Sequence, residues 1–405
     1  MQTRLPQDFL DTENGKMADS ILRSCVHCGF CTATCPTYQL TGDELDSPRG
    51  RIYLIKQMLE EQPVSRKTQV HLDRCLTCRS CETTCPSGVE YGKLIDLGRE
   101  WIESKNLRTV HERLQRWLLR KLLPYPKRYA WLLSLARLVR PVMPTKIKKM
   151  IPLKPVVGDL PTTTHTRKML MLNTCAQSVL QPNIDAATRR VLNHFNIELV
   201  YEAESGCCGA IDQHLSASRD AQKQMQTNID AWWPRLQNEI ECIVVNASGC
   251  GSHMKEYGHY FRNDPQYREK ALFVSSKVKD LSEVLTTLPL KNTKKTGTSH
   301  HIAFHSPCTL QHGMKITNHV EPLLEKCGYK LTQVRDSHLC CGSAGTYSIL
   351  QEKFSKQLLD KKIQCLGEHQ PDQIATANIG CLLHLQSQST VPVVHWVELI
   401  DQSLN

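Results

Sequence analysis

Several features are missing from this sequence, and each absence excludes a class of protein. The first residues, MQTRLPQDFLDTENG, contain no apolar stretch like that of a secretory signal, so we expect a protein that is not exported. The longest apolar run, WLLSLARLV at 131–139, is short and contains an arginine. No run approaches the roughly 18 apolar residues of a spanning helix, so we expect no transmembrane helix.

Nucleotide-binding loops are missing as well. No G-x-G-x-x-G follows a predicted strand, and the sequence has no Walker A loop, so neither FAD, NAD nor a nucleoside triphosphate has a recognisable site. A dehydrogenase needs a hydride acceptor such as a flavin. If the chain takes part in a dehydrogenation, FAD is therefore expected only on a partner subunit.

Positive charge is confined to one region. Residues 101–155 contain fourteen Lys and Arg but only Glu103 and Glu112 as acids, so this region carries +12 and the rest of the chain sums to −2. Such a distribution does not indicate a nucleic-acid-binding protein. We interpret 106–165 as a basic helical linker, with docking to a partner subunit or an amphipathic contact with anionic lipid as alternatives.

Cysteine, in contrast, is abundant, with nineteen residues in a chain of 405. Without a secretory signal, metal or redox chemistry is favoured over a disulfide framework. Two runs, CVHCGFCTATCP at 25–36 and CLTCRSCETTCP at 75–86, share the pattern C-x2-C-x2-C-x3-C-P at a constant offset of 50. This pattern is typical of ferredoxins that hold two [4Fe–4S] clusters, whereas zinc sites usually pair two C-x2-C hooks.

The spacing predicts crossed ligation. Three thiols of a run bind one cube, and the fourth, before proline, reaches the other cube. The first predicted ligand set is Cys25, Cys28, Cys31 and Cys85, and the second is Cys35, Cys75, Cys78 and Cys81. The segment between the two cysteine runs is predicted to be a helix that begins after the N-cap Ser47, and 91–105 is predicted to be another. With these helices, the region resembles the α-helical ferredoxin domain of succinate dehydrogenase and heterodisulfide reductase relatives.

After residue 165, strands and helices alternate, which predicts parallel sheets with helices on both faces. Strands are expected at 168–173, 197–203 and 242–247, and again at 302–306, 329–334 and 373–378. Helices are expected at 182–195 and 211–238, from 308 to about 327, and near 346–364.

A cysteine follows each of these strands, and the pattern occurs twice. The first set is Cys175, Cys207, Cys208 and Cys250, and the second is Cys308, Cys340, Cys341 and Cys381. The offset between repeats is 133 for the first three cysteines and 131 for the last. Because ligands of open α/β sheets bind at the carboxyl ends of strands, each set is expected to converge.

This duplicated pattern resembles the CCG, or cysteine-rich, domain of heterodisulfide reductase subunits. Where some members end in C-x-x-C, both repeats have histidine, as His253 and His384. Imidazole can bind zinc or iron, so zinc, an iron–sulfur cluster or no metal remain open for these sets. Capping of a loop is the alternative for His253 and His384. His305 and His312 flank Cys308 and are interpreted as polar loop residues, with a role in proton transfer or in a ligand set as the alternative.

The whole layout resembles the iron–sulfur subunits of glycolate oxidase (glycolate dehydrogenase). GFCTATCPTY, DSPRGRIYLIK and CLTCRSCETTCPSGVEYG carry this resemblance most specifically. It implies an electron-transfer subunit, inactive alone, that passes electrons from two flavoprotein subunits to a quinone or another acceptor. It also implies a location in the cytoplasm or peripherally on the cytoplasmic face of the bacterial inner membrane.

Two alternatives share this architecture: the iron–sulfur subunit of anaerobic glycerol-3-phosphate dehydrogenase, and a heterodisulfide-reductase-like catalytic subunit. The expected fold class is a multi-domain α+β protein, with a helical ferredoxin-like domain before duplicated α/β domains. The expected boundaries are 1–105 for the double-cluster domain, 106–165 for the linker, and 166–290 and 291–405 for the two CCG domains.

Overall fold

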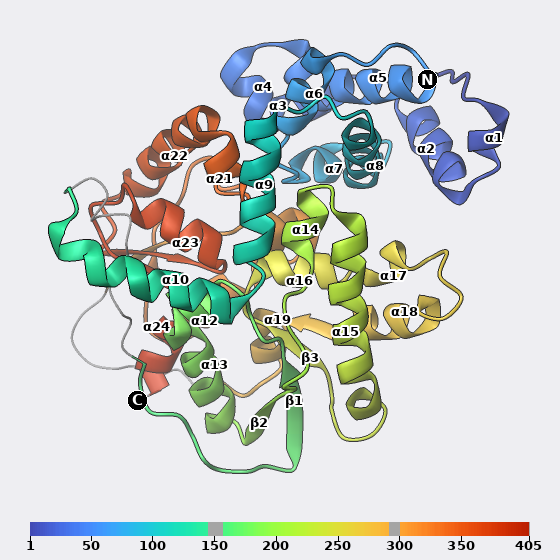
Figure 1. Cartoon of the computed structure of the whole chain (residues 1–405). Coiled ribbons are helices and arrows are strands. Elements are labelled where there is room, and N and C mark those ends of the chain that lie inside the picture. The colour runs from blue at the N-terminus through green and yellow to red at the C-terminus, as the bar shows by residue number, and fades with distance from the viewer. Residues whose placement is uncertain (145–156, 291–299, 405) are drawn as a thin grey trace.

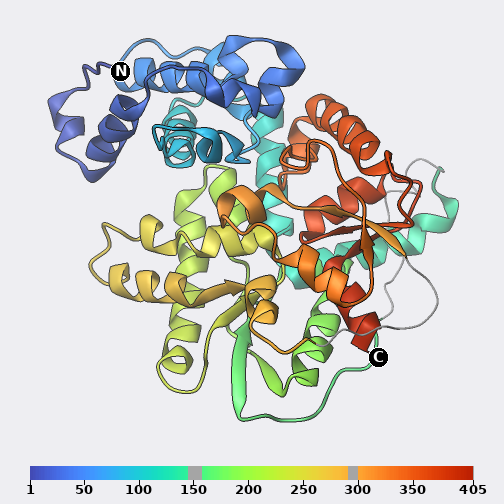
Figure 2. The same cartoon turned by 180° about the vertical axis from the view of Figure 1, so that it is seen from behind.

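The N-terminal hundred residues form helices that lie above two α/β halves (Figure 1). The computed structural model describes residues 1–144, 157–290 and 300–404. Figure 2 shows from behind that the blue N-terminal helices adjoin both the yellow-green first half and the orange-red second half. This arrangement confirms the expected class, a helical ferredoxin-like domain followed by a duplicated α/β fold.

The N-terminal part is held together by closely packed helices. These are α1 (Gln7–Leu10), α2 (Glu13–Ser24), α3 (Phe30–Ala33), α4 (Pro36–Thr41), η1 (Glu44–Asp46), α5 (Pro48–Leu59), α6 (Arg66–Asp73), α7 (Ser80–Thr84) and α8 (Tyr91–Ser104). As predicted, Ser47 caps α5 by accepting a hydrogen bond from the Gly50 N–H. A Cβ at Gly98 would lie 2.7 Å from Ile55, so glycine is what lets α8 approach α5.

Two helices of the basic region connect the N-terminal part to the α/β halves. They are α9 (Val110–Leu122) and α10 (Pro126–Val139), followed by η2 (Arg140–Val142). Thr109 and Glu112 form a capping box at the start of α9. The last part of the predicted linker includes residues 145–156, which lie outside the described residues.

The first α/β half has a four-stranded parallel sheet in the order β2-β1-β3-β4. Its elements are β1 (Arg167–Met171), α12 (Gln177–Leu180), α13 (Pro182–His194), β2 (Ile197–Tyr201), α14 (Ala210–His214), α15 (Ser218–Leu236), β3 (Ile243–Val245), α16 (Ser248–Met254), α17 (Tyr257–Tyr260), α18 (Arg268–Lys277), β4 (Val278–Asp280) and α19 (Leu281–Thr286).

The second half repeats the sheet in the order β6-β5-β7-β8. Its elements are β5 (His301–His305), the π-helical turn η3 (Thr309–Gly313), α20 (Val320–Lys326), β6 (Lys330–Leu331), α21 (Tyr347–Leu350), α22 (Glu352–Gly367), β7 (Gln373–Thr376), α23 (Ile379–Gln386), β8 (Val393–His395) and α24 (Trp396–Leu404). One buried apolar cluster extends from α13 of the first half to α24 of the second, so the halves share a core.

Three sequence expectations about these elements were wrong. The single helix predicted for 211–238 is two helices, because Ser216 adopts a left-handed φ of 59° between them. The helix predicted from 308 to about 327 is a π-helical turn and then α20, separated by a loop in which Lys315 and Asn318 have positive φ. The strand predicted at 329–334 pairs over Lys330–Leu331 alone.

Candidate metal centres

Two adjoining cavities in the N-terminal part are lined by the ferredoxin-type cysteines. The first, of about 430 Å³, is lined by Cys25, Cys28, Cys31, Cys81 and Cys85. The second, of about 300 Å³, is lined by Cys35, Cys75, Cys78 and Cys81. Each cavity thus contains one complete crossed set, and Cys81 reaches both. The ligation itself stays a prediction, but the structure brings all eight thiols to two places.

The two cysteine runs have the same local backbone, which explains how they present their thiols in the same way. His27 and Thr77 have positive φ at equivalent positions, and so do Gly29 and Arg79. A one-turn helix follows in each run, and then the Cys-Pro pair. Left-handed backbone at non-glycine residues costs on the order of 1–3 kcal/mol and is concentrated at functional sites. Its repetition in both runs indicates a loop shaped for binding.

The first cavity opens at the surface. Cys28 is exposed, and the neighbouring apolar side chains Val26 and Phe30 are 66 % and 61 % exposed. Burial raises the pKa of Cys31 to about 11, so its thiol holds its proton at neutral pH when no cation is nearby. Iron would supply that cation, and four thiols in one cavity match the donor set of a [4Fe–4S] cluster. The residues present therefore fit the cofactor.

The cysteines of the second cavity are more buried than those of the first, and hydrogen-bond donors are directed at sulfur. The Tyr91 hydroxyl donates to Cys75 Sγ at 3.5 Å, and the Thr77 N–H does so at 3.4 Å. Burial raises the pKa of Cys78 and of Cys81 well above the ordinary value. Arg51, only 1 % exposed, also lines this cavity and places a buried positive charge beside it.

The first α/β half gathers its four motif cysteines as expected. Cys175, Cys207, Cys208 and Cys250 form a chain of neighbouring side chains, each hydrogen-bonded to the next. The hydrogen bond to Cys207 and burial together raise the pKa of Cys175 well above its ordinary value. His253 is 3 % exposed, and its Nε2 has no hydrogen-bond partner among the described residues, while its ring packs against Tyr260 with centroids 5.0 Å apart.

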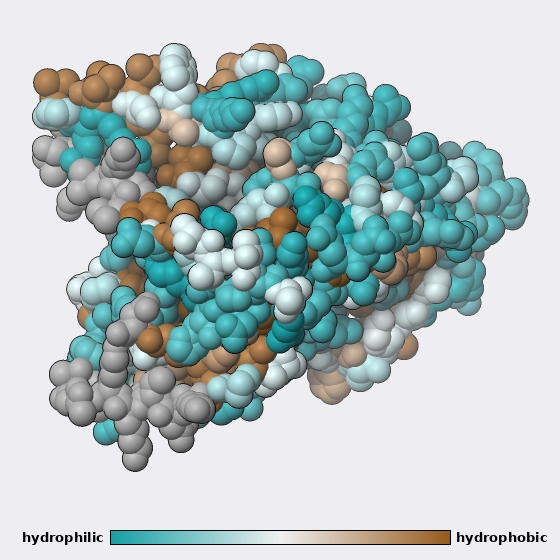
Figure 3. Space-filling model, turned by 90° about the horizontal axis from the view of Figure 1, so that it is seen from below, coloured by the Kyte–Doolittle hydropathy of each residue, from teal (hydrophilic) through white to brown (hydrophobic). Residues whose placement is uncertain are grey.

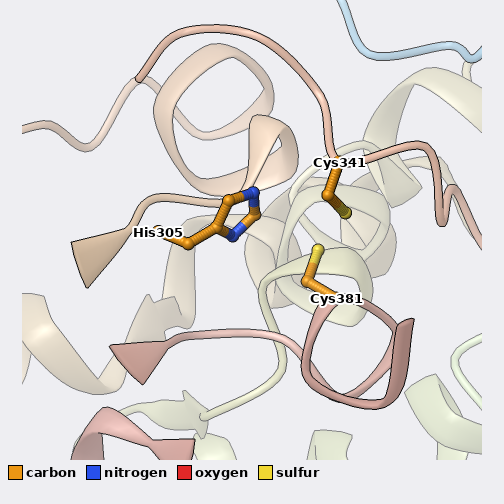
Figure 4. Close-up of side chains that lie close together, drawn as sticks. All are labelled: His305, Cys341 and Cys381. Atoms are coloured by element: carbon orange, nitrogen blue, oxygen red, sulfur yellow. The ribbon is translucent and has the colours of Figure 1, made fainter. Parts of the chain in front are cut away.

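The second half gathers its cysteines too, but with a different histidine from the one predicted. Cys308 Sγ lies 3.9 Å from Cys340 Sγ. The ligand atoms of His305, Cys341 and Cys381 all lie within 4.8 Å of one another, and the three side chains point toward each other in Figure 4. The four sequence-predicted cysteines thus all have thiol neighbours, and His305 lies beside two of them, whereas His384 is directed elsewhere.

The sequence suggested His384 as a possible metal ligand and His305 as a polar loop residue, but in the structure it is His305 that lies beside the cysteines. His384 Nε2 lies 3.0 Å from Ser355 Oγ, and His384 is not part of the three-residue group found in the described residues. His305, interpreted above as a polar loop residue, is instead 2 % exposed at the end of β5. Burial lowers the pKa of His305 to about 3, so its ring is neutral. The sequence did contain one signal of this burial. In the first repeat, the position equivalent to His305, three residues before the first motif cysteine, is the apolar residue Leu172.

The second cavity and the second thiol group are neighbours. Leu76 of the N-terminal part shares one buried cluster with Cys308, Cys340 and Tyr347, and Cys78 packs against this cluster. Two hydrogen bonds fix the same interface: Thr83 Oγ1 to His312 Nδ1 at 2.8 Å, and Tyr347 OH to the Arg74 carbonyl at 3.1 Å. His312 is therefore a contact between domains. Cysteines of the N-terminal part and of the second α/β half therefore lie close together at this interface.

Comparisons with known proteins agree with this geometry. The family description "4Fe-4S dicluster domain" matches residues 21–89, and "Cysteine-rich domain" matches twice, at 169–255 and 302–386. The chain is 49 % identical over 405 residues to the glycolate oxidase iron-sulfur subunit of Escherichia coli strain K12, covering 100 % of this chain and 99 % of the relative. The chain belongs to the family of glycolate oxidase iron–sulfur subunits. The family resemblance identified from the sequence is thereby confirmed.

Two further relatives are less similar to this chain. A probable glycolate oxidase iron-sulfur subunit of Bacillus subtilis strain 168 is 29 % identical over 405 residues, covering 92 % of this chain and 90 % of the relative. Lactate utilization protein A of Bacillus licheniformis is 25 % identical over 241 residues, 58 % of this chain and 99 % of that protein. Together they support an iron–sulfur electron-transfer subunit of an oxidoreductase.

The helices of the structure can be compared with the expectation that the chain has no transmembrane helix. Among residues 1–144, 157–290 and 300–404, every helix is too short or too polar to cross a bilayer.

Proposed function

We propose that this chain is the iron–sulfur electron-transfer subunit of a flavin-dependent glycolate oxidase complex that oxidises glycolate to glyoxylate. The observation that carries the proposal is the pair of adjoining cavities, each lined by four thiols of a crossed set. The full-length likeness to a glycolate oxidase subunit supports the substrate class. The alternative of a glycerol-3-phosphate dehydrogenase subunit has no comparable support in the relatives compared above.

In this proposal the eight ferredoxin-type cysteines hold two [4Fe–4S] clusters. The first cavity uses Cys25, Cys28, Cys31 and Cys85, and the second uses Cys35, Cys75, Cys78 and Cys81. Bound clusters of this kind carry one electron at a time. Cys81, Pro48 and Tyr91 line both cavities, so the protein keeps the two sites separated by a single shared wall.

The two cavities have different tasks because their surroundings differ. Exposed Cys28, with exposed Val26 and Phe30 beside it, forms the face on which a partner flavoprotein docks. The second cavity faces the α/β half that holds Cys308 and Cys340. FAD belongs to two partner subunits, and a quinone or another carrier accepts the electrons. The isolated chain accordingly has no turnover on glycolate.

Domain limits and location complete the proposal. The units 1–105, 106–165, 166–290 and 291–405 remain those proposed from the sequence. The complex lies in the cytoplasm or peripherally on the cytoplasmic face of the inner membrane.

Exposed apolar residues on α9, α10 and η2 alternate with arginine and lysine and suit an interfacial contact. They are Val110, Leu114, Trp117, Leu118, Trp131, Leu132, Leu135, Leu138, Val139 and Val142.

Figure 3 is consistent with such a contact. Most of the face seen from below is hydrophilic, but apolar residues gather toward the left, the side on which α10 lies in Figure 1.

The decisive experiment is purification from the native host with identification of attached subunits. A flavoprotein pair that oxidises glycolate is expected, and a glycerol-3-phosphate dehydrogenase in its place would overturn the substrate assignment. In the same complex, Cys28→Ser should remove the cluster of the first cavity. Glycolate-dependent dye reduction by the flavin subunits should then continue, while electron delivery through this chain falls to background. Full delivery with the substitution in place would show that the ligand set is wrong.

A further inference from the structure

Arg51 is a buried cation beside the second cavity. It lies on α5, is 1 % exposed, and lines this cavity together with Cys35 and Cys75. Arg51 Nη2 donates to Thr37 Oγ1 at 3.1 Å, and the same oxygen lies 3.3 Å from Cys35 Sγ. A single hydroxyl group therefore separates the guanidinium from the sulfur of a predicted cluster ligand.

The charge of Arg51 is only partly balanced by the groups around it. Among the described residues, its ion-pair partner is the buried carboxylate of Asp46, at 3.5 Å. The same carboxylate lies closer to Arg74, at 2.9 Å, so two guanidinium groups share one negative charge. Arg51 Nε donates to the His71 carbonyl, a neutral acceptor, at 2.7 Å. Because a buried charge without full compensation is costly, this position favours an anion in the cavity that Arg51 lines.

The other cations in the walls of the two cavities are paired. Arg49 lines the first cavity, but its Nε lies 2.5 Å from a carboxylate oxygen of Glu44, and both side chains are at least 33 % exposed. Solvent therefore screens a charge that already has its own partner. Arg79 lines the second cavity and is paired with Glu256. Among the described residues, no carboxylate lines either cavity, so Arg51 is what makes the two cavities electrostatically unequal.

We propose that Arg51 makes the second cavity the stronger electron-accepting site, so that electrons pass from the first cavity to the second. This inference rests on the proposed function, in which each cavity holds a [4Fe–4S] cluster. Four thiolates around an iron–sulfur cube form an anion that becomes more negative on reduction, and a buried positive charge beside it favours the reduced form. Arg51 therefore raises the reduction potential of the inner site above that of the outer site.

The inequality gives a direction to electron transfer between two sites with similar ligands. One electron leaves the outer site beside the exposed Cys28, which is oxidised, and enters the inner site beside Arg51, which is reduced. A guanidinium is charged throughout, so Arg51 stabilises the added electron without taking up a proton. Pro48 and Tyr91 line both cavities, so the transfer is short. The electron then rests at the site that adjoins the second α/β half.

Redox titration of the full chain with reconstituted clusters, followed by electron paramagnetic resonance, tests the proposal. The signal that remains in Cys28→Ser belongs to the inner site. In the wild type, this signal should be the first to appear as the potential is lowered. In Arg51→Met it should move to a potential lower by about 59 mV or more, which is a tenfold change in the equilibrium of a one-electron couple. Arg51→Lys keeps a positive charge and should shift the signal less, and the outer signal should not move in either variant.

Lys56→Met is the matched control. Lys56 is a cation of the same helix, but it is paired with Glu60 at 2.6 Å and lines neither cavity, so both potentials should equal those of the wild type.

Iron content separates a failure of this inference from a failure of the proposed function. A wild type with fewer than two clusters overturns the proposed function and this inference with it. With two clusters present, an inner signal that appears second overturns the inference alone. An R51M protein that keeps its iron and the wild-type potentials does the same. The order of the signals in the wild type decides the matter even if R51M does not fold.

Discussion

At the scale of single residues, the second cavity is defined by hydrogen bonds to sulfur as much as by its cysteines. Tyr91 is 4 % exposed and donates to Cys75 Sγ, a cysteine of the second predicted ligand set. Donors to ligand sulfur stabilise the more negative, reduced form of a cluster. If Cys75 binds a cluster as proposed, the Tyr91 hydroxyl is therefore expected to raise the reduction potential of that cluster.

Tyr91→Phe removes this donor while keeping the ring. We expect the potential of one of the two clusters to fall by on the order of tens of millivolts, because one hydrogen bond to charged sulfur is lost. A redox titration followed by electron paramagnetic resonance measures the change. Tyr53→Phe, on an exposed ring of α5, is the control and should leave both potentials unchanged. An unaltered potential in Y91F would mean that Cys75 is not a ligand.

The sequence predicted the positions of single residues well where the pattern that identifies them is local. The ferredoxin-type cysteines converge on two cavities as their spacing predicts, since three cysteines within seven residues leave the backbone few conformations. Their role as ligands stays a prediction. His305 was misjudged because its neighbours, Cys341 and Cys381, lie more than thirty residues away in sequence. Only the sheet brings β5, the CCG loop and the start of α23 together. Such contacts depend on strand order, which single-sequence periodicity does not contain.

At the scale of elements, the sequence analysis did not predict the last strand of either sheet, because these strands are short. β4 and β8 contain three residues each, too few to show an alternation of buried and exposed side chains. The longer strands β1 and β5 were identified, and so were α5, α8 and α13, because apolar periodicity and N-caps act within one or two turns. The element that follows β4 also has a titratable cap.

Asp280 caps α19 from a fully buried position. Its Oδ1 accepts hydrogen bonds from the Ser282 N–H and hydroxyl, and it is 1 % exposed. Burial raises the pKa of Asp280 to about 6 from an ordinary value of 3.8. Because the folded state holds this proton more tightly than the unfolded chain, the group favours folding fully below about pH 4. That contribution is lost as pH rises through 6.

Asp280→Asn keeps a good capping residue and removes the titration. Relative to the wild type, the variant should gain about 1.4 kcal/mol of stability between pH 5 and pH 7, one pKa unit of the shift. Thermal melting of both proteins at the two pH values measures the difference. If the gap between wild type and variant does not depend on pH, Asp280 is ionised in the folded protein over this whole range.

At the scale of the whole molecule, the N-terminal part is fixed against both α/β halves by specific polar contacts. Arg79 pairs with Glu256 of the first half, both largely buried, while Thr83 bonds His312 of the second. The two cavities consequently have fixed orientations relative to the rest of the chain. One faces outward at Cys28 and Phe30, and the other faces the second half.

Phe30→Glu tests the outward face as the docking surface of the flavoprotein partner. Phe30 is 61 % exposed, so a charge is tolerated by the fold and disrupts an apolar contact. Reduction of the clusters by glycolate through the partner subunits should slow by roughly tenfold or more, for a loss of about 1.4 kcal/mol or more at an interface anchor. Reduction by dithionite should be unaffected.

Leu272→Glu serves as the comparison, because Leu272 is 53 % exposed on α18, outside the cysteine cavities. It should leave the glycolate-driven rate unchanged. Equal rates for F30E and the wild type would place the partner on another surface.

The unequal exposure of the two cavities also sets an order of damage. Oxygen, peroxide and chelators reach Cys28 at the surface, whereas Cys78 lies against the buried cluster around Leu76 and Cys308. If both cavities hold clusters as proposed, the outer cluster is expected to be the first destroyed in air. Because Cys81 lines both cavities, loss of the outer cluster would then expose one wall of the inner site. On the proposed function, inactivation in air would proceed inward from the face that receives electrons, and the chain would lose its connection to the donor before its inner site fails.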